Sequence, residues 1–138
     1  MFTQAAKLVN ATKPLAVGDR LDTDIAGGNT AAMDTFHVLT GVSRELELIE
    51  APAELRPDFI GAGSHELSLS EAQSRPGAQG GFMARYDGYD IVLQGGSEKS
   101  TSIEALRTVL EVAWAGPKPP RYIQPRGEFA EKAVATWR

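Results

Sequence analysis

The sequence predicts an α/β fold in which parallel strands are joined by a crossover helix and followed by a small α+β appendage. Two β-rich runs flank a helical pattern within residues 14–43, which is typical of a parallel βαβ unit. A stretch rich in Gly, Ser, Gln and Pro follows at residues 70–81 and indicates a linker. We therefore expect a core at residues 1–69, the linker, and an appendage at residues 82–138 made of a hairpin plus helices.

The first half alternates between helix and strand signals. A short N-terminal helix is predicted to end near Lys13-Pro14, because the residue before a proline avoids the helical region; its apolar positions are Phe2, Ala5, Ala6, Leu8 and Val9. The apolar run "PLAVGD" predicts a strand, "TDIAGGNTAAM" a helix and "DTFHVLTGV" a second strand. A third short strand is expected at Asp58 to Ala62, after the polar, helix-prone "SRELELIEAPAEL".

The second half begins with a hairpin signal. "FMARYDGYDIVLQ" contains two strand-like runs around Asp87-Gly88, a pair favoured in two-residue turns. Next, Thr101 and Glu104 form a capping-box pattern at the start of an apolar stripe that ends at Gly116-Pro117, which predicts a long helix. A last helix is expected in "EFAEKAVATWR", after the proline-rich "GPKPPRYIQPRG".

Composition excludes several classes of function. The net charge of −4 argues against non-specific binding to nucleic acid or to an anionic membrane, because both need a basic surface. The chain has no cysteine, so a disulfide framework, a thiolate metal site and a thiol nucleophile are all excluded. No stretch reaches the ~18 apolar residues of a spanning helix. We expect a cytoplasmic protein with a small soluble ligand or a cation site.

Three aspartates follow the first core strand. Asp19 comes directly after "LAVG", where it would project from the carboxyl end of a parallel strand, and Asp22 and Asp24 follow at once. Clustered carboxylates without thiols or paired histidines suit a hard cation, and Mg²⁺ typically takes one or two protein carboxylates plus water and phosphate oxygens. The alternative is that Asp22 or Asp24 only caps the next helix.

Residues 14–43, "PLAVGDRLDTDIAGGNTAAMDTFHVLTGVS", resemble the fourth conserved motif and following strand of the haloacid dehalogenase (HAD) superfamily. The resemblance is closest to the capped class IIA branch, which includes phosphoglycolate, glycerol-phosphate and nitrophenyl-phosphate phosphatases. It continues through "ELELIEAPAELRPDFIGAG" and so covers residues 1–69, with Ala32 where the branch usually has glycine. The implied fold of this segment is a partial Rossmann-like HAD core.

The resemblance also implies a cofactor and a substrate class. Asp19 corresponds to the aspartate that coordinates Mg²⁺, and Asp24 to the acidic residue that orients the metal site. In this family a different aspartate attacks phosphorus while Mg²⁺ neutralises charge on the transferring group. The implied substrate of the full-length enzyme is a small phosphorylated metabolite such as a sugar, glycerol or glycolate phosphate.

The segments that carry the family's nucleophile, lysine and cap have no counterpart in this sequence. We therefore expect the C-terminal portion of a Mg²⁺-dependent phosphatase, inactive alone. A sheet without its earlier strands should leave the first strand here with an unpaired edge, which predicts a homo-oligomer formed through that edge. The alternative function is a non-catalytic, self-associating interaction or regulatory module.

Overall fold

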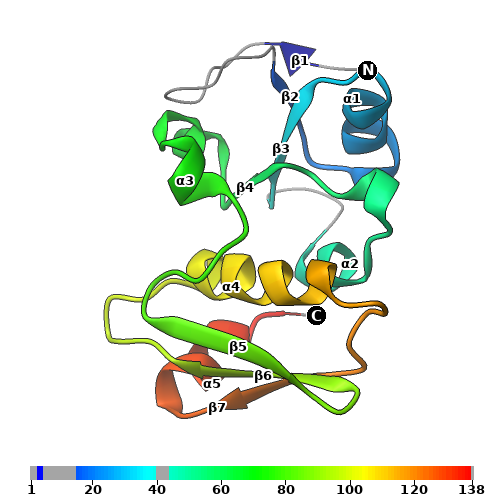
Figure 1. The fold of residues 1–138 in the computed structure, drawn as a ribbon. Helices are drawn as coiled ribbons and strands as arrows, with labels where there is room; N and C mark the ends of the chain where they lie inside the picture. Colours follow the sequence, from blue (N-terminus) through cyan, green and yellow to red (C-terminus); the bar gives the residue numbers. More distant parts are fainter. Residues whose placement is uncertain (1–2, 5–14, 40–43, 138) are drawn as a thin grey trace. The chain divides into compact units, whose positions relative to one another are not determined.

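The computed structural model describes residues 3–4, 15–39 and 44–137, and the chain divides into two compact units (Figure 1). Unit 1 is Met1–Arg75 and unit 2 is Pro76–Arg138. The segment predicted to be a linker contains the short helix α3 (Glu71–Ser74), capped by Ser70, and the boundary between the units follows it. No helix among the described residues is long and apolar enough to cross a membrane.

Unit 1 contains a four-stranded sheet with strand order β1-β2-β3-β4. Strands β2, β3 and β4 run parallel, and β1 runs antiparallel to β2. The mixed α/β fold predicted from the sequence is thereby confirmed. Besides α3, the elements of this unit are β1 (Thr3–Gln4), β2 (Leu15–Gly18), the π-helical turn η1 (Leu21–Ile25), α1 (Ala26–Thr30), β3 (Asp34–Val38), α2 (Glu45–Glu50), η2 (Ala53–Leu55), β4 (Phe59–Gly61) and η3 (Ser64–Ser68).

The core of unit 1 forms around β3, whose residues from Thr35 to Val38 are all buried. Phe36 on β3 stacks on Phe59 of β4, with ring centroids 6.5 Å apart. On α1, Gly28 lets the helix approach the sheet, because a Cβ there would lie 2.5 Å from Cγ2 of Thr35. These close contacts fix the crossover helix against β2 and β3 and thereby position the loop at the end of β2.

The predicted N-terminal helix is wrong at the residues where the structure tests it. Thr3 and Gln4 form β1, not a helix, and they pair with Val17 and Ala16 of β2. The other residues of the predicted helix lie outside the described ones. Because β1 pairs with the outer side of β2, Ala16 and Val17 do not lie at an unpaired edge. The prediction that the first core strand has an unpaired edge is therefore also wrong at these two positions. Hydrophobic spacing alone does not separate a short strand from a short helix.

Helix α1 ends in a Schellman motif with an alanine in a glycine position. Ala32 adopts a φ of 58°, while its N–H bonds the Asn29 carbonyl and the Met33 N–H bonds the Gly28 carbonyl. The left-handed conformation costs a residue with a Cβ about 1 kcal/mol more than glycine. The positive φ at this position therefore explains why the class IIA branch, which this segment resembles, usually has glycine here.

We expect Ala32→Gly to stabilise unit 1 by about 1 kcal/mol, because it relieves the left-handed strain at an exposed site. Urea unfolding followed by far-UV circular dichroism measures the change. Ala31→Gly is the matched control, since Ala31 has a φ of −82° and gains nothing from glycine. Equal effects at both positions would contradict the assignment of strain to Ala32.

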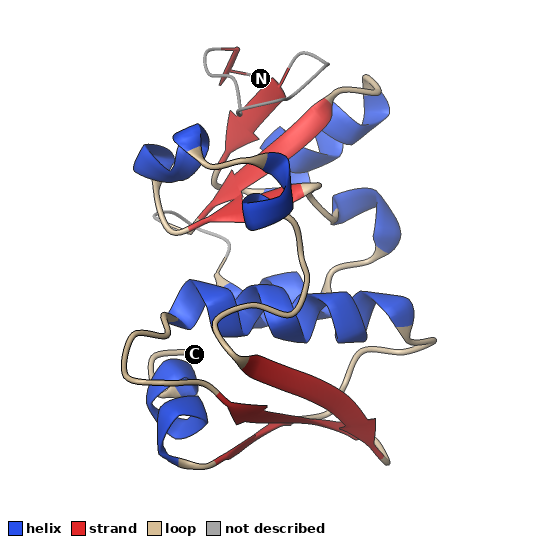
Figure 2. Cartoon of the chain, turned by 60° about the vertical axis from the view of Figure 1, so that its left-hand side comes forward, coloured by secondary structure: helices blue, strands red, loops and turns tan. Residues whose placement is uncertain are grey.

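Unit 2 contains a three-stranded sheet with order β5-β6-β7, and Figure 2 shows its long helix running along these strands. Strands β5 and β6 form the predicted antiparallel hairpin, and β7 runs parallel to β6 after the helix. The elements are β5 (Phe82–Asp87), β6 (Asp90–Gly95), α4 (Ser102–Ala115), β7 (Ile123–Arg126) and α5 (Glu128–Val134).

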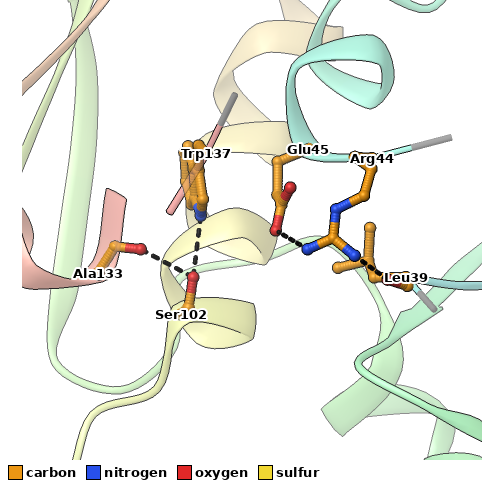
Figure 3. A network of polar contacts seen from close by, with 6 residues as sticks. All are labelled: Leu39, Arg44, Glu45, Ser102, Ala133 and Trp137. Atoms are coloured by element: carbon orange, nitrogen blue, oxygen red, sulfur yellow. Dashed lines mark hydrogen bonds and ion pairs between the residues drawn. The ribbon is translucent and has the colours of Figure 1, made fainter. Parts of the chain in front are cut away.

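Helix α4 matches its prediction at both ends. Thr101 caps the N-terminus in a capping box with Glu104, and Gly116 is the C-cap residue. Its apolar stripe forms the core of unit 2 with β6; the buried residues are Ile103, Leu106, Val109, Leu110, Ala113, Ile91, Val92 and Leu93. Trp137 then ties the C-terminal segment to α4, because its Nε1 donates to Oγ of Ser102, which donates to the Ala133 carbonyl (Figure 3).

Two features of unit 2 differ from expectation. The hairpin turn is Gly88-Tyr89 rather than Asp87-Gly88, because Asp87 pairs with Asp90. Of the two turn residues, only Gly88 has a positive φ, of 65°, as in a type II′ turn, which needs glycine at its first central position. The proline-rich connection contains the unpredicted strand β7, with Pro125 in it. A proline is tolerated there because β7 is an edge strand.

A buried carboxylate links β6 to the start of β7. Asp90 accepts hydrogen bonds from Nε of Arg121, at 3.2 Å, and from Nε2 of Gln124. The hydrogen bond from the Arg121 guanidinium holds the pKa of Asp90 below its ordinary value of 3.8. The carboxylate therefore helps to fix the parallel pairing of these two strands.

We expect unit 2 to lose stability in acid through Asp90. A carboxyl group with a lowered folded pKa stabilises fully above its unfolded pKa, about 4, and loses this contribution as the pH falls through the folded pKa. Thermal unfolding followed by tryptophan fluorescence reports on unit 2, since Trp114 and Trp137 both lie there. Asp90→Asn should reduce the slope of the melting temperature against pH below about pH 4, whereas Glu98→Gln, at an exposed carboxyl group of the same unit, should leave the slope unchanged. An unchanged slope in Asp90→Asn would contradict the assignment.

Candidate functional site

The candidate site lies at the carboxyl end of β2, where the chain leaves the sheet for the crossover helix. Strand β2 ends at Gly18, Asp19 follows, and the π-helical turn η1 begins at Leu21. The carboxyl ends of parallel strands are where open α/β sheets bind ligands. Leu21 and Ile25 are fully buried and anchor the turn, so that the aspartates between and before them remain accessible.

The π-helical turn directs Asp24 back toward Asp19. The N–H of Ile25 bonds the carbonyl of Arg20, at 3.2 Å and five residues back, which widens the turn relative to an α-helix. Oδ2 of Asp24 accepts the backbone N–H of Asp19 at 3.2 Å. Neither η1 nor α1 has a side-chain N-cap hydrogen bond, so Asp24 does not cap a helix.

Gly18 makes this approach possible. A Cβ at residue 18 would lie 2.2 Å from Cβ of Asp24 and 2.5 Å from its Oδ2. No side chain fits at these distances, so the glycine is a steric requirement for the position of Asp24. The sequence contains the signal, a glycine directly before Asp19, but not the partner that approaches it.

The third aspartate is engaged elsewhere. Asp22 forms an exposed ion pair with Arg20, with Oδ2 3.1 Å from Nη2. The hydrogen bonds that Arg20 donates to the Asp22 carboxylate, followed by the negative charge of Asp22, raise the pKa of Arg20 above its ordinary value. The carboxylate of Asp19, in contrast, has no hydrogen bond or ion pair to any described residue. The described residues contain no group of three or more acidic, histidine or cysteine side chains able to hold a metal ion.

A polar network braces the opposite end of the crossover helix. Asn29 donates from Nδ2 to the carbonyls of Glu54 and Arg56, at 2.9 and 3.0 Å. Thr35 at the start of β3 donates its backbone N–H to Oδ2 of Asp58 at 2.9 Å. These contacts join α1, β3 and the entrance to β4, and the sequence contains no local pattern that predicts them.

Comparison with known proteins decides the family. Residues 1–67 match the family model described as HAD-hydrolase-like. The N-terminal half of the chain belongs to the HAD-like hydrolases. This HAD-like chain is 35% identical over 97 residues to D-glycerol 3-phosphate phosphatase of Mycobacterium tuberculosis, a match that covers 70% of the chain and 26% of that enzyme.

Two further similarities agree with the class IIA branch. Phosphoglycolate phosphatase 2 of Arabidopsis thaliana is 49% identical over 43 residues, which cover 31% of this chain and 14% of that enzyme. The crystal structure of a glycerol phosphate phosphatase from Mycobacterium tuberculosis in complex with magnesium superposes with a TM-score of 0.80 at 30% identity, over 89% of this chain and 37% of that one. The HAD-like chain thus spans about a quarter of the first relative. The predicted resemblance is confirmed.

Proposed function

We propose that unit 1 contributes the magnesium-binding part of a phosphatase that acts on a small phosphomonoester, such as glycerol phosphate or glycolate phosphate. The observation that carries the proposal is the arrangement at the end of β2. Asp24 is held over Gly18 by the N–H of Asp19, while the Asp19 carboxylate accepts no hydrogen bond and forms no ion pair among the described residues. The class of substrate is that named for the similar phosphatases.

The donor set suits Mg²⁺. The ion prefers oxygen ligands and keeps several waters, so one or two protein carboxylates and substrate phosphate oxygens complete its coordination. Asp19 would bind the ion directly. Asp24, through its hydrogen bond to the backbone of Asp19, would orient that ligand. When bound, Mg²⁺ would neutralise charge on the phosphoryl group during transfer.

This chain supplies only part of such an enzyme under the proposal. Unit 1 would hold the cation and orient its ligand, and the groups that attack phosphorus and select the substrate would come from the parts of the relatives that this chain does not match. The chain alone is then inactive. The absence of cysteine fits action in the cytoplasm, where we place the protein.

The test measures hydrolysis of an aryl phosphate and of glycerol phosphate with and without Mg²⁺. The chain is assayed alone and after mixing with the part of the mycobacterial phosphatase that precedes the matched region. We expect no turnover by the chain alone, and Mg²⁺-dependent turnover by the mixture that chelation with EDTA abolishes. Turnover that persists in EDTA would contradict the metal assignment, and Mg²⁺-dependent turnover by the chain alone would show that a nucleophile lies within it.

A further inference from the structure

Strand β5 forms one edge of the sheet in unit 2 and carries a row of exposed side chains. Met83, Arg85 and Asp87 alternate along the strand and are all exposed, Met83 by 58%. Tyr89 follows in the hairpin turn and is 78% exposed. The residues between them point the other way, as shown by Tyr86, whose hydroxyl donates to the Lys118 carbonyl after α4 at 2.8 Å.

The backbone of the hairpin shows which residues face the open edge. The Gly81 carbonyl accepts the N–H of Gly96, so odd-numbered residues of β5 direct their backbone groups toward β6. Even-numbered residues direct theirs away from β6, and Ala84 lies in the middle of this set. An antiparallel strand added at this edge would therefore hydrogen-bond at even positions. Its side chains would come closest at odd positions, which are the exposed ones.

We propose that β5 pairs antiparallel with β5 of a second copy of this chain, about a two-fold axis beside Tyr86. In this register Arg85 lies opposite Asp87 of the second copy, and the same pair forms again across the axis. Met83 then lies beyond the last paired residue of the second copy, beside its hairpin turn. Both charged side chains of the row thus meet an opposite charge in the second copy.

The charges select both the partner and the register. Charged residues on an edge strand usually prevent pairing with other strands. Here two opposite charges stand two residues apart, so the row is complementary to itself in an antiparallel arrangement, as a two-fold interface requires. An axis beside Arg85 would instead place Arg85 opposite Arg85 of the second copy, which is unfavourable. The dimer joins two three-stranded sheets into one.

The first experiment is sedimentation equilibrium of the full chain over a range of concentrations. A single pair of strands is a small interface, so we expect a weak, concentration-dependent dimer. Arg85→Glu and Asp87→Arg should each raise the dissociation constant about tenfold or more, and the double exchange should return it to within about threefold of the original. Lys132→Glu, which changes the charge on α5 by the same amount as Arg85→Glu does on β5, is the control for that variant and should have no effect.

The second experiment tests the register by disulfide cross-linking. Because the chain has no cysteine, any cross-link must join the introduced cysteines. Arg85→Cys and Asp87→Cys variants are oxidised separately and as a mixture. The mixture should form a cross-linked heterodimer, whereas Arg85→Cys alone should not, because its two Cβ atoms lie too far apart. A chain that stays monomeric, a dimer indifferent to both charge reversals, or efficient cross-linking of Arg85→Cys alone would overturn the proposal.

Discussion

Replacing Asp19 with asparagine is expected to lower Mg²⁺-dependent turnover of the complemented phosphatase at least about 100-fold. The substitution keeps the size of the side chain and the backbone N–H that Asp24 accepts, so it removes one negative charge and little else. Loss of a residue that only orients a metal ligand typically costs 10–100-fold, and loss of a ligand should cost more. Steady-state rates over a range of Mg²⁺ concentrations measure the effect.

Substitutions of the other two aspartates provide the comparison for this result. Asp24→Asn should cost about 10–100-fold, since an amide oxygen is a weaker acceptor for the Asp19 N–H. Asp22→Asn should change the rate little, because Asp22 pairs with Arg20 at an exposed position. If Asp22→Asn lost as much activity as Asp19→Asn, the assignment of Asp19 as the ligand would be wrong.

Replacing Gly18 with alanine is expected to destabilise unit 1 by about 1–3 kcal/mol, and to displace Asp24. The added Cβ would stand 2.2 Å from Cβ of Asp24, the rigid base of that side chain, so rotation about its side-chain bonds does not relieve the clash. The turn η1 has to move away from β2 instead. Hydrogen exchange of peptides covering residues 15–39 measures the loss of protection.

A double variant separates this clash from other effects of Gly18→Ala. Asp24→Gly removes the Cβ that the new side chain would meet, so Gly18→Ala should cost much less in that background than in the original chain. The difference between the two costs is the coupling free energy, which we expect to exceed about 1 kcal/mol. Costs that simply add would mean that Gly18 acts through something other than contact with Asp24.

Sequence patterns predicted the elements whose signals are local. The capping box of α4, its apolar stripe and its terminal glycine lie within one continuous segment, so both ends of the helix were predictable. Strands β2, β3 and β4 followed from short apolar runs. Strand β1 was missed because two residues carry no periodicity, and β7 because the edge position that tolerates Pro125 is a property of the folded sheet.

The candidate site was likewise predictable only where its signals are local in the sequence. The sequence predicts that Asp19 follows a buried strand and that Asp24 is near it. It does not show that the Asp24 carboxylate returns to the N–H of Asp19, because that depends on the wide turn between them. The pairing of Asp22 with Arg20, which withdraws one of three aspartates from the site, likewise depends on the conformation of that turn.

The wide turn also makes the length of this segment as important as its composition. Gly18 fits against Asp24 at one end, and Gly28 fits against Thr35 at the other, so both ends are fixed by contact. Removing or adding one residue between them would rotate everything beyond it by about 100° around the helix axis. Asp24 or Gly28 would then face the wrong way. Single-residue insertions and deletions in this loop should therefore be tolerated less well than most substitutions within it.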